Sequence, residues 1–418
     1  MDSVYLKGHG RIDLSLVVRM RYTLLQLLHD NYLFLLLRNI CSILKKICMS
    51  REEYYFFHKG DSERKILFVF FDNLKTCRPD CNEMFINVSK VLKDDDYDII
   101  YYEEKRKFDL NRTLSFISLL ANWIHTLVCM KVRIILATEI LKEAIDCFDA
   151  RKKLDAMLSY DDIKLAVFFY DANSKDNYFS QYFQKKGIKT ATLQHGIQLA
   201  PRKEVINNVD FSGIEFGSFV SDYYLAWNEF TKQEAIKAGI NENRIIVLGV
   251  AKCIGRQPIV SDTKCPIVGL LLDGIFEDEN NLPMINMLNK FCVRHNLKLK
   301  LRYHPNYRGN EYDEAVENSI RIHTKKGESL TDFIKSVGFC VLANSTVLFE
   351  LEFFGSPFIR YSSGNIKDKY RDYQCLTFQD EIGIESCYKT LAESFDSSLK
   401  KSICVDDNYR VFFEKFIR

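Results

Sequence analysis

The feature that most constrains the fold of this chain is a repeated alternation of short apolar runs and helix-patterned segments. Residues 65–71 (KILFVFF) and 164–170 (KLAVFFY) have the length and composition of buried strands, and a segment with helical spacing follows each. Strands that alternate with helices predict a mostly parallel sheet. The pattern is interrupted at residues 251–266, which contain Gly, Pro and Ser, and begins again at residue 267.

We therefore predict an α/β chain with two doubly wound, Rossmann-like domains that face a cleft, and a mostly helical N-terminal extension. With 418 residues the chain is long enough for two such cores. Two local expectations within this scheme are a strand over residues 132–137 and a helix over residues 312–318. The predicted parts are an extension over 1–60, a first domain over 61–255, a second domain over 256–400, and a final helix over 401–418 that could return to the first domain.

Charge and cysteine content exclude some classes of protein. The formal net charge is +2, which gives no overall electrostatic reason to expect a nucleic-acid partner. The thirteen cysteines are an odd number, and several, such as Cys129, Cys292 and Cys340, lie within apolar runs, which is typical of buried thiols in a reducing compartment. Cys77 and Cys81 have no second pair of ligands, so we expect no zinc site there.

The N-terminal part shows neither a secretory signal nor a clear membrane span. Residues 22–49 are rich in Leu and Ile, but charged residues interrupt them. A spanning helix needs about 20 predominantly apolar residues. Two alternatives remain open: an interfacial helix on the anionic inner face of a membrane, supported by Lys45 and Lys46, or a helix that packs on the body of the protein.

The second half contains two polar motifs, each at the end of a predicted strand. One strand ends at His304, and the next predicted strand ends at the sequence Asn344-Ser345-Thr346, which a predicted helix follows. Asn344 or Ser345 could cap that helix, and its free N–H groups and positive dipole end would then favour a phosphate. His304 could donate a hydrogen bond to the same phosphate or protonate it as it leaves. The alternative is that these residues only form a helix cap and a turn.

Further candidates lie near these motifs. Asp273 and Gly274 end the first predicted strand of the second half, and Asp273 could cap a turn or lie near the donor. Glu350 is about one helical turn after Thr346 and could reach a ribose hydroxyl, or it could be a surface carboxylate. The arginines that could neutralise a phosphate are Arg302, Arg308 and Arg360.

In the first half, the sequence Gln194-His195-Gly196 ends a predicted strand. His195 could act as a general base on an acceptor hydroxyl, or it could be a structural histidine. Asp171, at the end of another predicted strand, is a reserve candidate for the base. The chain lacks the P-loop, GxSxG and HExxH motifs, and it has no Asp-x-Asp pair at a predicted strand end, so we expect no metal-held diphosphate.

These residues resemble motifs of bacterial surface-polysaccharide transferases of the GT-B fold. That group includes sialyl- and polysialyltransferases, capsule Kdo transferases and the CDP-glycerol glycerophosphotransferases of teichoic-acid synthesis. His304-Pro305 and Ser345-Thr346 are similar, in order and type, to the HP and S-[S/T] motifs of the sialyltransferases, whereas Asp273-Gly274 matches only half of their acidic-Gly motif. With His195-Gly196, the same residues are similar to the motif trio of the glycerophosphotransferases. The resemblance covers residues 164–361.

The resemblance implies an inverting transfer of a sugar from a nucleotide-activated, CMP-linked donor to a glycan or glycolipid acceptor, with neither a metal nor a cofactor. It implies that His304, Asn344, Ser345, Thr346, Gly274 and Glu350 bind the donor, and that His195 or Asp273 is the base. It also implies a cytoplasmic enzyme that could lie on the inner face of the plasma membrane. The alternative function is a CDP-alditol phosphotransferase. A non-catalytic glycan-binding protein and a nucleotide-sugar epimerase are the remaining hypotheses.

Overall fold

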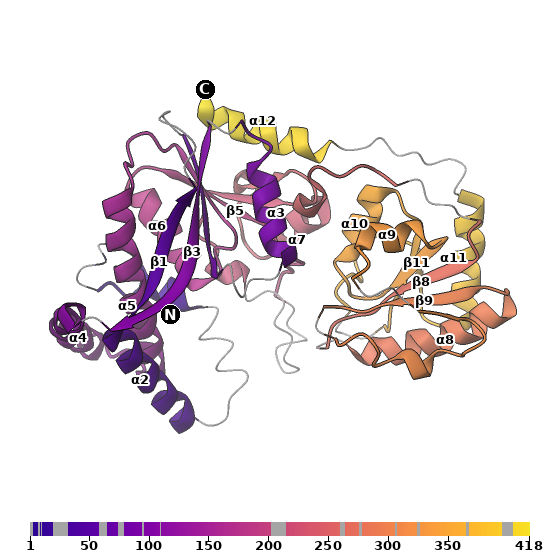
Figure 1. Cartoon of the computed structure of the whole chain (residues 1–418), viewed down its shortest axis with the longest axis horizontal. Coiled ribbons are helices and arrows are strands. Elements are labelled where there is room, and N and C mark those ends of the chain that lie inside the picture. Colours follow the sequence, from indigo (N-terminus) through magenta and orange to yellow (C-terminus); the bar gives the residue numbers. More distant parts are fainter. Residues whose placement is uncertain are drawn as a thin grey trace. The chain divides into compact units, whose positions relative to one another are not determined.

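The computed structural model of the chain describes residues 3–6, 9, 11–19, 32–57, 65–73, 79–93, 96–108, 110–201, 215–259, 264–275, 278–305, 307–323, 327–364, 368–394 and 404–418. The chain divides into two compact units (Figure 1). Unit 1 comprises Met1–Ile254 and Val405–Arg418, and unit 2 comprises Gly255–Cys404. The last helix therefore belongs to the same unit as the first half of the chain.

Within the described residues, the sheet of unit 1 has seven strands in the order β1-β3-β2-β4-β5-β6-β7. β1 runs antiparallel to β3, and the other neighbouring strands are parallel. The strands are β1 Met49–Phe57, β2 Ile66–Asn73, β3 Tyr97–Phe108, β4 Leu165–Phe168, β5 Lys189–Leu193, β6 Tyr223–Ala226 and β7 Ile245–Val247.

Helices cover both faces of this sheet. They are α2 Tyr32–Cys48, α3 Pro79–Ser89, α4 Leu110–Cys129, α5 Ile134–Met157, α6 Ser174–Lys185, α7 Glu229–Lys237 and α12 Val405–Ile417. Alternate residues of a strand point to opposite faces, and β2 shows this directly. Val69 belongs to the buried cluster that includes α5 and α6 residues, whereas the Phe68 ring contacts Phe85 of α3 and Phe413 of α12.

Unit 2 has a wholly parallel sheet of six strands, counted over the described residues, in the order β10-β9-β8-β11-β12-β13. Its strands are β8 Ile267–Leu271, β9 Lys298–Arg302, β10 Arg321–Ile322, β11 Phe339–Leu342, β12 Phe358–Tyr361 and β13 Thr377–Phe378. Its helices are α8 Asn281–Arg294, α9 Leu330–Lys335, α10 Val347–Phe354 and α11 Glu381–Ser394.

The core of unit 2 also lies on both faces of its sheet. Val268 and Leu270 of β8 belong to a buried cluster with Met284 of α8 and Ile384 of α11. Gly269, between them, points the other way, and a Cβ atom there would lie 2.8 Å from the Phe333 ring of α9. The prediction of two doubly wound α/β units is therefore confirmed.

Three local expectations are corrected. Met49–Phe57, expected to be helical, forms β1, because it pairs along its length with β3, which is distant in sequence. Residues 132–137, expected to be a strand, lead into α5, whose residues are mostly buried, and a short apolar run cannot distinguish a strand from a buried helix. Over residues 312–318 the structure has only a 3₁₀ turn, Asp313–Ala315.

The structure also tests the expectations for the 22–49 segment and for the cysteines. The part of the 22–49 segment that precedes residue 32 lies outside the described residues, Tyr32–Cys48 forms α2, and Met49 begins β1. No helix in the described ranges combines the length and the hydropathy that crossing a bilayer requires. Cys292 and Cys340 are buried as expected, whereas Cys129 is exposed at the end of α4, and Cys77 is outside the described residues.

Candidate functional site

Three of the predicted motifs lie at one edge of the unit 2 sheet. The strands β9, β8 and β11 are neighbours and run parallel, so their carboxyl ends lie side by side. His304 follows β9, Asp273 and Gly274 follow β8, and Asn344 follows β11. The carboxyl edge of an open parallel sheet is where α/β proteins bind ligands. The structure thus brings together residues that are 30 to 70 positions apart because their strands are adjacent.

Hydrogen bonds fix both the side chain and the backbone of Asp273 at this edge of the sheet. Its side chain is buried, with Oδ1 accepting from the Asn344 backbone N–H at 2.9 Å and Oδ2 accepting from Asn280 Nδ2 at 2.9 Å. The backbone of Asp273 forms two further hydrogen bonds with the Asn281 side chain. These contacts favour a role for Asp273 in positioning the β11–α10 loop, in place of the role of a base that touches the acceptor.

The β11–α10 loop presents unused backbone donors. Thr346 is the N-cap residue of α10, and it makes no side-chain capping bond, whereas Ser345 Oγ accepts a long hydrogen bond of 3.4 Å from the Val347 N–H. Within the described part of the chain, the N–H groups of Ser345 and Thr346 donate to no acceptor, and both residues are partly exposed. Asn344 is buried instead of capping, with Oδ1 accepting from the Lys369 N–H at 3.1 Å.

His304 lies against the backbone of Gly274. A Cβ atom on Gly274 would be 3.3 Å from His304 Nδ1 and 3.4 Å from Cε1, which is closer than an ordinary contact, so the absence of a side chain lets the imidazole occupy this place. The His304 side chain is partly exposed. Because Gly274 follows Asp273, and Asp273 binds Asn344, the imidazole and the start of α10 are joined by one short chain of contacts.

The charged residues around the site are mainly engaged elsewhere. Glu350 is buried on α10, so the expected reach to a ribose hydroxyl would need this side chain to leave its place. Burial lowers the pKa of Arg302, and the charges of Glu328 and Glu350 oppose this shift. Arg360 is buried in an ion pair with Asp368 at 2.7 Å, and is therefore unavailable to a phosphate. Arg308 is exposed.

His195 belongs to unit 1 and lies two residues after the end of β5. Its ring centroid is 4.1 Å from that of Tyr170 and 5.5 Å from that of Phe169, and its side chain is partly exposed. Gln194 fixes the turn: its side chain donates to the Gly196 carbonyl at 2.8 Å and accepts from the Trp227 N–H at 2.6 Å. A Cβ atom on Gly196 would meet nothing within 4 Å, so the space beside this residue is open within the unit.

The reserve candidate Asp171 has a structural environment. It is buried, and its Oδ2 accepts from the backbone N–H groups of Val220 at 3.1 Å and Ser221 at 2.8 Å. Burial raises the pKa of Asp171, against the effect of these hydrogen bonds. Of the three residues considered as a base, His195 is therefore the one whose side chain is not buried.

Sequence reasoning missed the residues that support the site. Asn280 and Asn281 bind Asp273, and the Lys369 backbone binds Asn344. The Asn-Asn pair at the beginning of the predicted helix is a signal that could have been noticed, whereas nothing in the sequence marks Lys369. In the described ranges, no three His, Cys, Asp or Glu side chains gather as a set of metal ligands.

Comparison with known proteins gives a likeness of fold. No protein-family model and no curated protein matches the sequence. A protein from Listeria monocytogenes described as a UDP-N-acetylglucosamine 2-epimerase has a similar structure, with a TM-score of 0.51 and 11% identity over 83% of this chain and 94% of that one. The UDP-GlcNAc 2-epimerase of Neisseria meningitidis bound to UDP-GlcNAc gives 0.49, with 10% identity over 84% of this chain and 99% of that one.

A glycotransferase of kitacinnamycin is also similar, with a TM-score of 0.45 and 10% identity over 85% of this chain and 95% of that one. Identities this low show a shared fold and leave the activity open. The narrower resemblance to sialyl-, Kdo and glycerophosphotransferases stays a prediction. The chain has two Rossmann-like α/β units and a GT-B-like fold.

Proposed function

We propose that the protein is a glycosyltransferase that makes a bacterial surface polysaccharide of the capsule or lipopolysaccharide type. It transfers a sugar, with inversion, from a nucleotide-activated and CMP-linked donor to a glycan or glycolipid acceptor. The observation that carries the proposal is the arrangement at the carboxyl edge of the unit 2 sheet. There, the His304 imidazole follows β9 and the free N–H groups of Ser345 and Thr346 follow β11, the two strands that flank β8, and Asp273 at the end of β8 links them.

Each residue of this edge has a proposed role with the donor. The N–H groups of Ser345 and Thr346, at the positive end of α10, bind the donor phosphate. His304 donates a hydrogen bond to the same phosphate and protonates it as the nucleotide leaves. Together these groups offset the charge that develops on the leaving group, so the proposed reaction needs no metal ion. Gly274 makes room for the imidazole, and Asp273 positions Asn344 and the loop that follows.

His195 is the proposed base that removes the proton from the acceptor hydroxyl. An unperturbed histidine has a pKa of about 6.5, which suits proton transfer near neutral pH. Its imidazole is partly exposed, whereas Asp171 and Asp273 are buried and hydrogen-bonded. Gln194 holds the turn that carries His195 and would keep the imidazole in place.

We also propose that unit 1 binds the inner face of the membrane through α2 and α4. Each helix has a buried apolar stripe and, in addition, an exposed one. Leu35 and Ile43 of α2, with Trp123 and Leu127 of α4, are buried. On α2 the exposed large apolar residues Leu33, Leu37, Ile40 and Leu44 are separated by four, three and four positions. On α4 the residues Ile117, Ile124 and Val128 are separated by seven and four positions.

The charge of this surface favours an anionic membrane. Neither α2 nor α4 contains an Asp or Glu, whereas Arg38, Lys45, Lys131 and Arg133 are exposed on or beside them. An apolar face flanked by exposed basic residues suits a bilayer that contains anionic lipids. A symmetric dimer through the same face would place like charges opposite one another, and this disfavours a second copy of the chain as the partner.

Nucleotide binding tests the proposal. Thermal unfolding of the wild-type protein would be followed with CMP, CDP, UDP and GDP in the presence of EDTA, and repeated with His304→Ala. We expect CMP to raise the unfolding temperature of the wild type and to have a much smaller effect on the variant. An exposed histidine of the same unit, His323, supplies the matched control His323→Ala. The proposed donor site would be contradicted if no nucleotide raised the unfolding temperature of the wild type. It would also be contradicted if CMP raised the unfolding temperatures of His304→Ala and His323→Ala equally.

A donor screen separates the related alternatives. Turnover of a CDP-alditol without turnover of CMP-sugars would indicate the alternative function, a phosphotransferase of the teichoic-acid type. Stabilisation by UDP, with conversion of a UDP-sugar in the absence of any acceptor, would indicate an epimerase, the activity named for the Listeria protein of similar fold. The glycosyltransferase, the phosphotransferase and the epimerase would share the proposed phosphate site, and they would differ in the bond that each breaks.

A further inference from the structure

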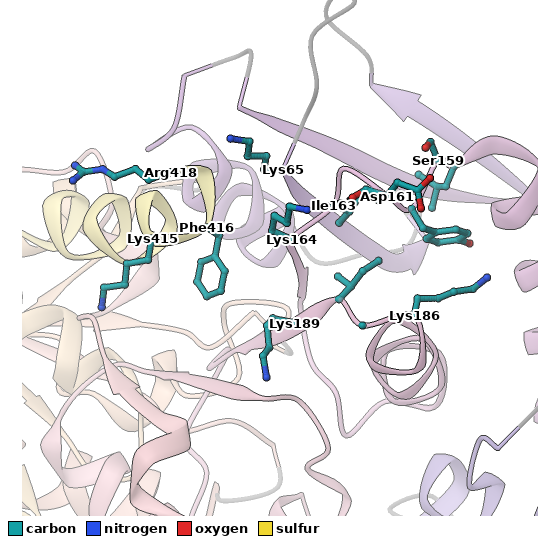
Figure 2. Close-up of a pocket in the computed structure, with 14 residues that line it drawn as sticks. Lys65, Ser159, Asp161, Ile163, Lys164, Lys186, Lys189, Lys415, Phe416 and Arg418 are labelled. Atoms are coloured by element: carbon teal, nitrogen blue, oxygen red, sulfur yellow. Dashed lines mark hydrogen bonds between the residues drawn. The ribbon is translucent and has the colours of Figure 1, made fainter.

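Six basic residues are among the fourteen residues that line a large cavity in unit 1. Its volume is about 890 Å³, and it lies between the last turn of α12, the end of α6 and the beginnings of three strands (Figure 2). Asp161 is the single acidic residue among the residues that line it. The basic lining residues are Lys65, Lys164, Lys186, Lys189, Lys415 and Arg418.

Three of these lysines lie at the beginnings of three neighbouring strands of the sheet. Lys65 and Lys164 directly precede β2 and β4, and Lys189 is the first residue of β5, the next strand. Their backbones are hydrogen-bonded in a row, because Lys164 N donates to the Lys65 carbonyl at 2.7 Å and Lys189 N donates to the Lys164 carbonyl at 3.1 Å. Adjacent strands are about 4.8 Å apart, so the three backbone positions are close. The register pairs Lys189 with Leu165, so the Lys189 side chain leaves the sheet on the face opposite to that of Lys164.

Counted over the residues that the structure describes, only two of these six charges form an ion pair with a carboxylate. Lys189 pairs with Asp222 at 3.2 Å, and Arg418 pairs with Glu414 at 2.9 Å. Lys65 Nζ donates to the Ile417 carbonyl, and Lys164 Nζ donates to the Asp161 carbonyl at 3.3 Å. Like charges on adjacent strands destabilise a sheet. A cluster of this kind therefore costs stability in the empty protein, and bound anions would offset that cost.

The remaining walls of the cavity suit a ligand with both charged and apolar parts. Lys186 lies over the Tyr160 ring, with Nζ 4.9 Å from its centroid, and Phe416 forms part of the α12 side. Figure 2 shows Lys415, Phe416 and Arg418 on one side, Lys186 on the other, and Lys65, Lys164 and Lys189 between them. Long lysine stems can turn their ammonium groups toward a ligand that enters this space.

This cavity is separate from the edge that carries His195. Lys189 begins β5 and His195 follows its other end, so the two lie at opposite edges of the unit 1 sheet. We propose that the cavity binds an oligoanion, which is a molecule with at least two phosphate or carboxylate groups. Basic side chains from six positions line the cavity, so a ligand with several oxyanions can contact more of them than a single small anion can.

Binding of defined anions to the full chain tests this inference. Isothermal titration at low ionic strength would use tripolyphosphate and tri-galacturonate, which separate phosphate from carboxylate ligands, and inorganic phosphate as the single-group comparison. The double variant Lys164→Gln/Lys186→Gln is matched by Lys90→Gln/Lys185→Gln, which changes the net charge equally at two exposed lysines that do not line the cavity. We expect the first variant to bind the oligoanion at least about tenfold more weakly than the control.

Unfolding of the empty protein gives a second measurement. Lys164→Gln removes the central charge of the row, so we expect the variant to unfold at a higher temperature than wild type and to lose most of the shift that the oligoanion causes. Equal binding by the two double variants, no binding of either oligoanion, or a lower unfolding temperature for the empty Lys164→Gln protein would overturn the proposal. The nucleotide-binding experiment tests the proposed donor site in unit 2. Its result can therefore be distinguished from the result for the oligoanion cavity in unit 1.

Discussion

The carboxylate of Asp273 accepts a hydrogen bond of 2.9 Å from the backbone N–H of Asn344, which lies 71 positions later in the chain. This contact joins the end of β8 to the beginning of the β11–α10 loop. It holds in place the two residues whose N–H groups are the proposed phosphate donors. The same carboxylate accepts from Asn280 Nδ2, so Asp273 connects three segments of unit 2.

Asp273→Asn should therefore lower stability as well as nucleotide binding. The NH₂ group of the new asparagine is itself a donor, and it would face a second donor, either Asn280 Nδ2 or the Asn344 N–H. One buried hydrogen bond would therefore be lost. Such a loss costs about 1–3 kcal/mol. Scanning calorimetry would measure the effect on unfolding, with Asp278→Asn, at an exposed position of the same segment, as the control. Unchanged stability with a large loss of turnover would instead indicate that Asp273 is the base.

Gly274→Ala should weaken nucleotide binding by displacing His304. The new Cβ atom would lie 3.3 Å from Nδ1, and the imidazole would have to move by a few tenths of an ångström. The measurement is a double-mutant cycle on CMP affinity with His304→Ala. If the alanine acts through the imidazole, its effect disappears in the His304→Ala background. An effect of equal size in both backgrounds would show that Gly274 contacts the nucleotide directly.

Leu37→Gln combined with Val128→Gln should reduce binding to vesicles that contain anionic lipid, because each removes an exposed apolar side chain from the proposed membrane face. The exposed fractions of Leu37 and Val128 are 54% and 69%. Co-sedimentation with phosphatidylglycerol-containing vesicles would measure binding, and Ile382→Gln, at a residue 81% exposed in unit 2, is the control. Wild-type protein that remains in the supernatant but forms dimers would show that the face binds a second copy.

His9 should make the stability of unit 1 depend on pH. Burial, with a smaller contribution from the charge of Arg151, lowers the pKa of His9 from 6.5 to about 3. The unfolded chain then binds a proton below pH 6.5 that the folded protein does not bind until about pH 3. The stability that neutral His9 provides is therefore complete above pH 6.5 and is lost progressively as the pH falls toward 3, by up to about 1.4 kcal/mol per pH unit.

His9→Phe tests this effect. The difference in unfolding free energy between wild type and variant should move in favour of the variant as the pH falls from 6.5 to 4. The readout is tryptophan fluorescence in denaturant, because both tryptophans, Trp123 and Trp227, lie in unit 1. Wild type and the exposed-site variant His323→Phe should show the same pH dependence. A constant difference between wild type and His9→Phe would contradict the prediction.

Much of the fold followed from local pattern. The described residues Ile66–Phe71 of β2 and the runs of β4 and β11 are short and wholly buried, and β5 and β8 are buried after their first residue. Both faces of a parallel sheet are covered, and this gives a signal that a single sequence shows. β1 was missed because its pairing partner, β3, is distant in the chain. α5 was partly misread because a buried helix has the same apolar composition as a buried strand.

The sequence by itself determined the alternation of strands and helices and the identity of the polar residues at strand ends, since both depend on residues near one another in the chain. Only the tertiary structure decided the strand order that brings Asp273, His304 and Asn344 to adjacent strand ends, and the burial that engages Asp171, Glu350 and Arg360. The row of Lys65, Lys164 and Lys189 has the same origin. Strand order and burial depend on packing between distant segments, and local spacing does not encode that packing.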